Sequence, residues 1–411
     1  MALLVQKFGG TSVADAASIQ RVAQRIYDTI QEDNQVIVVV SAMGKTTDEL
    51  VKLAGEVHAD PNDREFDMLL STGEQISISL LAMALHALGA EAVSMTGPQA
   101  GIFTDGTHTK AKIKEIQPER VLNEIQKGRV VIVAGFQGLT AEQNIATLGR
   151  GGSDLTAVAM AAAVKADRCQ IFTDVDGVYT SDPRIVSAAQ KLDVIAYDEM
   201  LELASMGANI LQSRAVEYAK KYKVELEVLS SFRLKPGTLV KEEVKDMEDV
   251  VIRGIAIDKN QSKITITDVV DQPGVAAKIF QEIFRADINV DVIVQSDSKQ
   301  GRNDISFTAN ADELKKVKTV LSNTMSGIEH AEVMYDEKVA KISIVGVGMR
   351  NHTGIAYRMF SALAENEINI HMISTSEIRT SVIIKEAQAD KAVRVIHTAF
   401  GLDKEESLSE T

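Results

Sequence analysis

Val36-Ile-Val-Val-Val40 is an uninterrupted run of β-branched residues, which indicates a strand buried on both faces. Similar short apolar runs occur at Leu3-Leu4-Val5, Val130-Val-Ile-Val133 and Gln170-Ile-Phe-Thr173. Helical patterns separate them, and the pattern before Val36 has its apolar positions at Ile19, Val22, Ala23, Ile26 and Ile30. Strands that alternate with helices are typical of a mostly parallel α/β sheet with right-handed crossovers. We therefore predict an α/β domain over residues 1–245.

Composition excludes several classes of protein. The 411 residues carry 44 Lys+Arg against 58 Asp+Glu, a net charge of −14, so the chain has no general affinity for nucleic acid. The single cysteine, Cys169, excludes a disulfide framework and a Cys-rich zinc site, and we expect it to be a buried structural thiol. The seven histidines show no metal-ligand spacing, so no metal site is predicted. We find no stretch of about 18 apolar residues and no signal-peptide pattern, and so expect a cytoplasmic protein without a membrane span.

A change of pattern near residue 245 indicates a domain boundary. A turn signal at Lys235-Pro-Gly-Thr-Leu-Val240 precedes the charge-rich stretch 241–249. That stretch alone is equally compatible with a linker and with a solvated helix face. Since the residues after it follow a different pattern, we predict a second region over 246–411.

The second region contains an internal repeat with an offset of 80 residues. Gly274-Val-Ala-Ala-Lys-Ile-Phe280 aligns with Gly354-Ile-Ala-Tyr-Arg-Met-Phe360. Each copy has the order strand, helix, strand, strand, helix, which is one strand short of a ferredoxin-like βαββαβ unit. The first copy, 262–336, can take Ile328–Tyr335 as its last strand. The second, 337–405, has no such candidate after it, so we predict that Val250–Ile257 completes its sheet and that the copies are interlaced.

Two glycine-bearing segments follow the first two strands. In Lys7-Phe-Gly-Gly-Thr-Ser12 the glycines let backbone amides approach a ligand, and the lysine suits a phosphate. Ser41-Ala-Met-Gly-Lys-Thr-Thr47 resembles a P-loop, but Val39 stands where that motif requires a glycine, so we reject that interpretation. The segment still lies at the end of a predicted parallel strand, where ligands commonly bind.

Three further segments carry candidate chemistry. Thr147-Leu-Gly-Arg-Gly-Gly-Ser-Asp154 combines exposed backbone donors with an arginine fork, as in an anion or carboxylate site, and opens an Ala-rich helix. The segment Thr173–Tyr179, with Asp182-Pro-Arg184 after it, lacks the glutamate of a calcium loop, so a nucleotide-binding loop is the better interpretation. Thr72-Gly-Glu74-Gln75 taken alone is more typical of an ordinary helix start than of a functional site.

Taken together and in this order, these segments resemble the motif set of the aspartate kinase family. The C-terminal repeat, including Ile373-Ser-Thr-Ser-Glu-Ile378, resembles that family's paired ACT domains. The resemblance covers nearly the whole chain. It implies an amino-acid-kinase fold followed by two interlaced ferredoxin-like ACT domains. It also implies transfer of the γ-phosphoryl group of ATP, with Mg²⁺ held mainly by the phosphates, to the β-carboxylate of L-aspartate, a first step towards lysine, threonine and methionine.

The resemblance also implies roles for individual residues. Lys7 and Asp154 would be catalytic. The aspartate site would contain Thr47, Glu74, Arg150, Gly151, Gly152 and Ser153. The ATP site would contain Lys7, Phe8, Gly9, Gly10, Ser41, Thr173, Asp174, Tyr179, Arg184 and Asn209. Asn209 stands where the family usually has a lysine, which implies weaker ATP binding unless Lys220 or another lysine compensates.

The ACT pair implies feedback control by lysine, threonine or both, and an assembly as a homo-oligomer or with a separate regulatory subunit. Backbone amides after Gly274 and Gly354 suit the effector's carboxylate, and polar side chains suit its ammonium. The expected effector residues are Asp271, Gly274, Val275, Ala276, Asn289, Val290, Asp291, Gln295, Gly354, Ile355, Asn369, Ile370, Ser376, Glu377 and Ser381. Two alternatives stay open at this point: another amino-acid kinase, such as an acetylglutamate or glutamate kinase, and an inactive amino-acid sensor on a kinase-like scaffold.

Overall fold

The computed structural model describes residues 1–205, 211–242, 251–325 and 331–404. Its contacts divide the chain into two compact units. The first contains Met1–Tyr179, Lys191–Ser205 and the described residues 211–242. The second contains Thr180–Gln190 and the described residues from 251 onward. The predicted boundaries inside the chain stay predictions, and the two units are described separately below.

An eight-stranded sheet forms the centre of the first unit, in the order β10-β12-β11-β9-β1-β2-β6-β3. Its strands are β1 (Leu3–Phe8), β2 (Gln35–Val40), β3 (Ala92–Met95), β6 (Val130–Ala134), β9 (Arg168–Thr173), β10 (Val194–Ala196), β11 (Leu226–Ser230) and β12 (Thr238–Lys241). All neighbours pair in parallel except β11 and β12. The four apolar runs of the sequence are adjacent here as β9-β1-β2-β6, which confirms the prediction of a mostly parallel α/β sheet.

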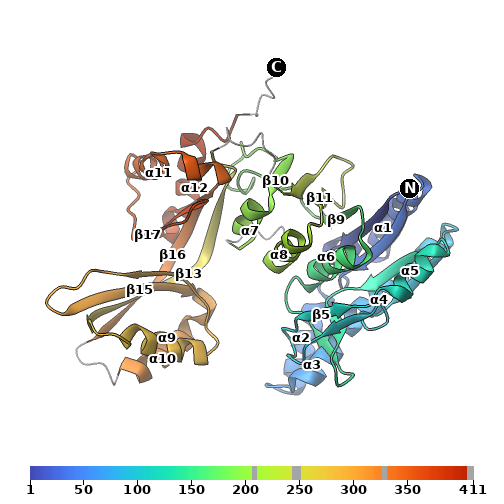
Figure 1. Cartoon of the computed structure of the whole chain (residues 1–411), viewed down its shortest axis with the longest axis horizontal. Helices are drawn as coiled ribbons and strands as arrows, with labels where there is room; N and C mark the ends of the chain where they lie inside the picture. The colour runs from blue at the N-terminus through green and yellow to red at the C-terminus, as the bar shows by residue number, and fades with distance from the viewer. Residues whose placement is uncertain (206–210, 243–250, 326–330, 405–411) are drawn as a thin grey trace. The chain divides into compact units, whose positions relative to one another are not determined.

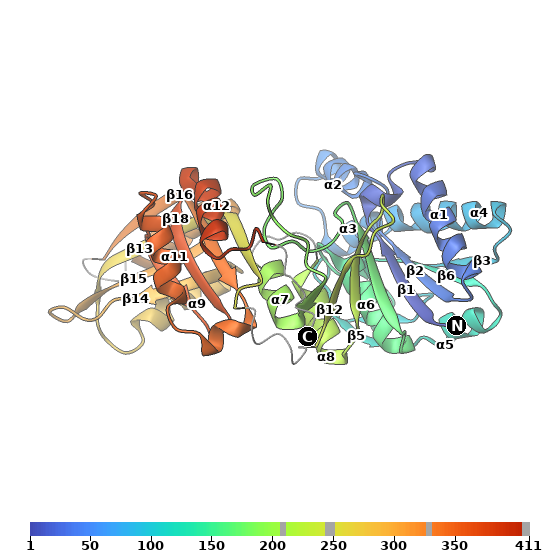
Figure 2. The same ribbon diagram turned by 90° about the horizontal axis from the view of Figure 1, so that it is seen from above.

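Helices cover both faces of this sheet, as Figures 1 and 2 show for the strands around β1. The helices of the first unit are α1 (Ala16–Gln31), α2 (Thr46–Val57), α3 (Asp63–Leu70), α4 (Thr72–Ala87), α5 (Glu119–Gln126), α6 (Gly152–Val164), α7 (Tyr197–Ser205) and α8 (Ser213–Tyr222). Val36, Val38 and Val40 of β2 share one core with α1 and α4. Helix α6 packs against β1, β2 and β9 and is buried along nearly its whole length. This two-sided burial explains the continuous Val/Ile runs.

A second, four-stranded sheet in the first unit has the order β5-β4-β7-β8. Its strands are β4 (Ile102–Thr104), β5 (Ile113–Ile116), β7 (Gln137–Leu139) and β8 (Ile145–Thr147). Strand β8 leads directly into the glycine-rich segment before α6. This sheet was not predicted, because strands of three or four residues show too little periodicity.

One helical run in the described part of the chain, Asp63–Ala87, is long and apolar enough by length and composition to cross a membrane. Half of its most apolar window is buried inside the protein. Ile78, Leu81 and Leu85 pack in the core beneath α1. This packing is what a core helix of a globular domain shows.

The second unit contains one six-stranded sheet, in the order β14-β15-β13-β16-β18-β17. Its strands are β13 (Gly254–Val270), β14 (Val290–Gln295), β15 (Arg302–Asn310), β16 (Glu332–Val345), β17 (Met372–Thr375) and β18 (Arg379–Lys385). Its helices are α9 (Val275–Arg285), α10 (Leu314–Met325), α11 (Ile355–Ala364) and α12 (Ala389–Ala399). Helices α9 and α10 share one core with β13 and β15, and α11 and α12 share another with β16 and β18.

The interlacing of the two repeats is confirmed. Gly254–Ile257 pairs with Ile342–Val345, inside the sheet of the second copy. Further along β13, Ile264–Thr267 pairs with Glu332–Tyr335, inside the sheet of the first. We predicted separate strands, but β13 and β16 each run without a break through both copies. Residues 258–262 and 336–339 contain no glycine or proline to end a strand, and register shifts near Gln261 absorb the transition.

Candidate active site

The buried ion pair of Lys7 and Asp154 is at the centre of the candidate site. Lys7 is on β1 and Asp154 is in the first turn of α6, with Nζ 2.6 Å from Oδ1. Each residue is less than a tenth exposed. Helix α6 begins at Gly152, so Ser153 and Asp154 belong to its first turn and the helix fixes the position of Asp154. Buried charges cost free energy unless they are paired, so each residue depends on the other.

Three backbone segments meet beside this pair at distances that only glycine allows. A Cβ on Gly10 would lie 2.8 Å from the carbonyl oxygen of Ala42, and one on Gly73 would lie 2.8 Å from the Cβ of Ala42. The amide of Gly44 donates to the carbonyl of Gly10 over 3.0 Å. The ends of β1 and β2 and the start of α4 are therefore packed together, which brings three of the predicted motifs into one site.

Glu74, in the first turn of α4, brings a buried carboxyl group to this junction. It is only 3 % exposed, and its Oε1 accepts a hydrogen bond of 3.1 Å from the amide of Ala42. Its other oxygen, Oε2, has no hydrogen-bond partner among the described residues. Burial raises the pKa of Glu74 to about 7, and amide hydrogen bonds from Glu74 and Ala42 oppose that shift. A buried acid with an unused oxygen is suited to a cationic partner.

The glycine-rich segment between β8 and α6 presents Arg150. Gly149 and Gly151 have φ of +78° and +68°, in the left-handed region that favours glycine. Arg150 is exposed between them. The side chain of Gln212 donates from Nε2 to the carbonyl of Arg150 over 2.8 Å, and a Cβ on Gly151 would lie 2.6 Å from Gln212 Cγ. The segment is therefore held in place although Arg150 is exposed.

The other predicted substrate and phosphate residues surround this centre. Ser41 follows β2, where its amide donates to the carbonyl of Phe8 over 3.1 Å. Thr47 is half-buried in the first turn of α2. Ser153 is buried, and its Oγ lies 2.6 Å from where a Cβ on Gly135 would be.

The end of β9 adjoins the end of β1 and carries the predicted nucleotide loop. Phe8 and Phe172 stack with ring centroids 4.5 Å apart, and the Arg25 guanidinium lies 4.6 Å from the Phe172 centroid. Thr173 accepts a hydrogen bond of 3.1 Å from the amide of Val175, and Asp174 is exposed. Tyr179 is half-buried, and burial raises the pKa of its phenol.

Two predicted nucleotide residues, Arg184 and Asn209, stay predictions. Arg184 belongs to the second compact unit, where its guanidinium donates to both oxygens of Asp182. Asn209 lies outside the described residues. Lys220, the lysine considered as a replacement for it, forms an ion pair of 2.5 Å with Asp198.

The predicted effector residues are on the second unit. Gly274 and Gly354 precede α9 and α11 with φ of +96° and +86°, so the repeated glycines share one backbone role. Asp291 forms an ion pair with the buried Lys341. Ser381 is buried and shares a hydrogen bond with Ser343, and Glu377 pairs with Arg350 over 3.2 Å. Among the remaining polar residues, Asp271, Asn289, Gln295, Asn369 and Ser376 are exposed.

Sequence reasoning missed several residues that shape the site. Phe136, with φ of +70°, lies between β6 and β7, and its Cδ2 is 3.0 Å from where a Cβ on Gly152 would be. A bulky residue in that conformation is strained, which is a mark of functional sites. Gln212, directly before α8, and Arg214, in its first turn, reach the glycine-rich segment. No motif marks these residues, since their roles depend on contacts between distant segments.

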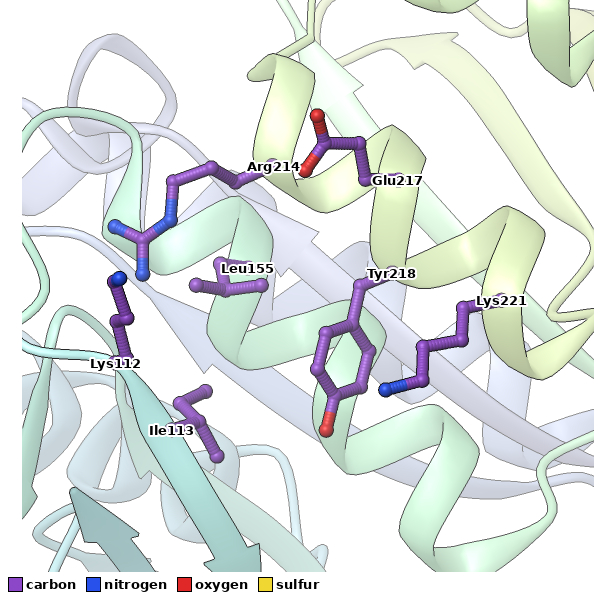
Figure 3. A pocket seen from close by; sticks show the side chains of 7 residues that line it. All are labelled: Lys112, Ile113, Leu155, Arg214, Glu217, Tyr218 and Lys221. Carbon is purple, nitrogen blue, oxygen red and sulfur yellow. The ribbon is translucent and has the colours of Figure 1, made fainter. Parts of the chain in front are cut away.

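A pocket of about 200 Å³ lies between α6, α8 and the start of β5. Figure 3 shows its lining, which is Lys112, Ile113, Leu155, Arg214, Glu217, Tyr218 and Lys221. Arg214 donates from this pocket to the carbonyls of Leu148 and Ala111, over 2.7 and 3.0 Å. In the part of the chain that the structure describes, no group of three or more His, Cys, Asp or Glu residues could hold a metal ion.

Two protein families match this chain. Residues 2–230 match the amino acid kinase family, and residues 257–325 and 342–400 match the ACT domain. The aspartokinase of Mycolicibacterium smegmatis is 51% identical over 98% of this chain and 97% of its own. An aspartate kinase of Pseudomonas fluorescens is 53% identical, with 98% of both chains covered.

Solved structures agree with these relatives. E. coli aspartokinase III in complex with aspartate and ADP superposes with a TM-score of 0.82 at 26% identity, covering 97% of this chain and 99% of that one. The chain belongs to the aspartate kinase family and is an ATP-dependent kinase with an amino-acid-kinase domain and ACT domains.

Proposed function

We propose that Glu74 binds the ammonium group of L-aspartate and that Arg150 binds its α-carboxylate, leaving the β-carboxylate to attack the γ-phosphorus of ATP. The observation that carries this proposal is the buried Glu74 carboxyl with its unused Oε2. The phosphoryl group passes to a β-carboxylate oxygen and ADP leaves, giving 4-phospho-L-aspartate. Since the acceptor is already ionised, positioning and charge stabilisation are the main catalytic requirements.

In this proposal Lys7 stabilises negative charge on the transferring phosphoryl group, and Asp154 holds Lys7 in position. The amides of Gly9 and Gly10 contribute hydrogen bonds, and Mg²⁺ enters with ATP as part of that substrate. Ser41, Thr173, Asp174 and Tyr179 border the nucleotide, and Thr47 and Ser153 border the aspartate. Interactions of this kind act on charge that develops in the transition state.

A coupled assay for ADP formation tests the acceptor. L-Aspartate, L-glutamate and N-acetyl-L-glutamate are compared at equal concentrations with Mg·ATP in excess. We expect rapid turnover with L-aspartate alone. Preference for either of the other acceptors would contradict the proposed arrangement of Glu74 and Arg150.

We further propose that the ACT domains bind lysine, threonine or both as end-product inhibitors, in a cytoplasmic pathway towards lysine, threonine and methionine. E. coli aspartokinase III, 25% identical with a TM-score of 0.77, has been solved in complex with lysine and aspartate in a T-state. In the present chain Gly274 and Gly354, both with positive φ, stand directly before α9 and α11, and amides in the first turn of a helix suit a carboxylate.

The two glycines provide a matched test of which repeat binds the effector. An added Cβ meets no atom within 4 Å at either position, so alanine acts only through its preference for negative φ, at a cost of about 1 kcal/mol. We expect Gly274→Ala or Gly354→Ala to raise the half-inhibitory concentration of lysine or threonine about fivefold in the repeat that binds it. Inhibition curves are measured for both variants. Unchanged curves for both would exclude effector binding at these helix starts.

Exposed apolar residues on the edge strands of the six-stranded sheet support an assembly through the ACT domains. Ile293 and Val294 are on β14, and Ile373 is on β17. Unpaired edges with apolar side chains favour strand pairing between chains. We therefore propose a homo-oligomer or an assembly with a separate regulatory subunit. Light scattering on the purified chain distinguishes the homo-oligomer from a monomer.

A further inference from the structure

Asp67 is a buried carboxylate outside the motifs described above. It lies on α3 with no exposed surface, and three partners on other segments donate to it. They are the hydroxyl of Thr147 at 2.5 Å, Nδ1 of His108 at 2.7 Å and the amide of Thr109 at 3.0 Å. A buried carboxylate is costly unless such bonds satisfy it. Asp67 therefore joins α3 to β8 and to the loop between β4 and β5.

Thr109 has a strained backbone that these bonds hold in place. Its φ is +63°, which is unfavourable for a β-branched residue. Its carbonyl oxygen lies 3.2 Å from where a Cβ on Gly149 would be. Asp67 thus fixes a backbone segment that packs directly against the glycine before Arg150.

The segment that carries Arg150 is held at successive residues. The hydroxyl of Thr147 donates to Asp67, and the carbonyl of Thr147 accepts from the amide of Ala111 over 2.9 Å. The carbonyl of Leu148 accepts from Arg214, whose guanidinium is seen in Figure 3 near Lys112, the residue before β5. Arg150 itself is exposed, so its position depends on these supports. A binding group placed by such a second layer of contacts is sensitive to losing any of them.

We infer that Asp67 is a positioning residue for aspartate binding, acting through Thr147 on the segment that presents Arg150. The inference rests on the proposed role of Arg150. Asp67 touches no reacting group, so its loss affects the binding of aspartate and leaves the binding of ATP nearly unchanged.

The hydroxyl of Thr147 permits a controlled test. Thr147→Val keeps the shape and removes the donor to Asp67, whereas Thr147→Ser keeps the donor. In steady-state kinetics we expect Thr147→Val and Asp67→Asn each to raise the KM for aspartate about tenfold. The KM for ATP changes by less than about twofold, and Thr147→Ser restores the KM for aspartate to within about twofold of the natural chain. The double variant Asp67→Asn/Thr147→Val raises it by less than the product of the two single effects, since both changes disturb the hydrogen bond between Asp67 and Thr147.

Arg150→Lys is measured in the same series. Suppose that Arg150→Lys raises the KM for aspartate. If Thr147→Val then leaves that KM unchanged, or if Thr147→Val raises the KM for aspartate and for ATP equally, the positioning inference is overturned and the role of Arg150 stands. If Arg150→Lys leaves the KM for aspartate unchanged, the proposed role of Arg150 is overturned and the inference with it. Should Asp67→Asn fail to fold, the comparison of valine with serine at 147 decides alone.

Discussion

Lys7→Met will lower kcat by about a thousandfold, because it removes the one buried cation proposed to face the transferring phosphoryl group. Lys7 lies at the end of β1 with its Nζ 3.5 Å from where a Cβ on Gly9 would be, close to amides that also suit a phosphate. Its ion pair with Asp154 fixes it there. Lys45→Met, in the exposed part of the neighbouring Ser41–Thr47 segment, serves as the matched control and should change kcat by less than about twofold.

Loss of folding has to be separated from loss of chemistry. Lys7→Met leaves Asp154 buried without its partner, which destabilises the fold by about 3 kcal/mol or more. Removing both charges with Lys7→Met/Asp154→Asn avoids that cost, so the double variant should recover most of the thermal stability and none of the activity. Recovery of activity together with stability would show that Lys7 has only a structural role.

The central sheet and the interlaced repeats could be predicted from the sequence because their signals are local. Val36–Val40 is buried on both faces. That burial requires β-branched apolar residues, and a run of these residues is also the pattern that predicts a strand. Gly274 and Gly354 appear at one offset because both repeats need the same left-handed residue before a helix. Likewise, Lys7, Glu74 and Asp154 stand within glycine-bearing motifs, and the structure brings those segments together.

Other features could not be predicted because they depend on contacts between distant segments. Asp67 and Thr147 are 80 residues apart, and neither belongs to a pattern that indicates a hydrogen bond. Strained conformations at Thr109 and Phe136 follow from tertiary packing, which overrides local preference. The packing of Val186 in the core of α11 and α12 assigns Thr180–Gln190 to the second unit, and no change of composition marks that segment.

Glu74→Gln will raise the KM for aspartate about a hundredfold at pH 8, because an amide cannot pair with the substrate's ammonium as a buried carboxylate does. The KM for ATP should change by less than about threefold, since Glu74 is proposed to contact only the amino acid. In the natural chain burial raises the pKa of Glu74 to about 7. Below that pH Glu74 is mostly protonated and cannot form an ion pair with the ammonium group of aspartate. The KM for aspartate should therefore rise about tenfold for each pH unit below 7, and Glu74→Gln should abolish this dependence.

In the absence of substrate, Glu74→Gln should make the fold more stable, although it weakens the binding of aspartate. A carboxyl whose pKa is raised from 4.5 to about 7 favours the folded state only while protonated, so its ionisation destabilises the fold progressively between those two values. At pH 8 the penalty approaches about 3 kcal/mol, and glutamine removes it. Thermal melting should show Glu74→Gln to be more stable than the natural chain at pH 8 and nearly equal at pH 4.5. Glu74→Gln is expected to raise the KM for aspartate and to raise thermal stability together only if the ionised Glu74 carboxylate serves to bind the substrate. Equal stability at both pH values, with KM unchanged, would remove Glu74 from the site.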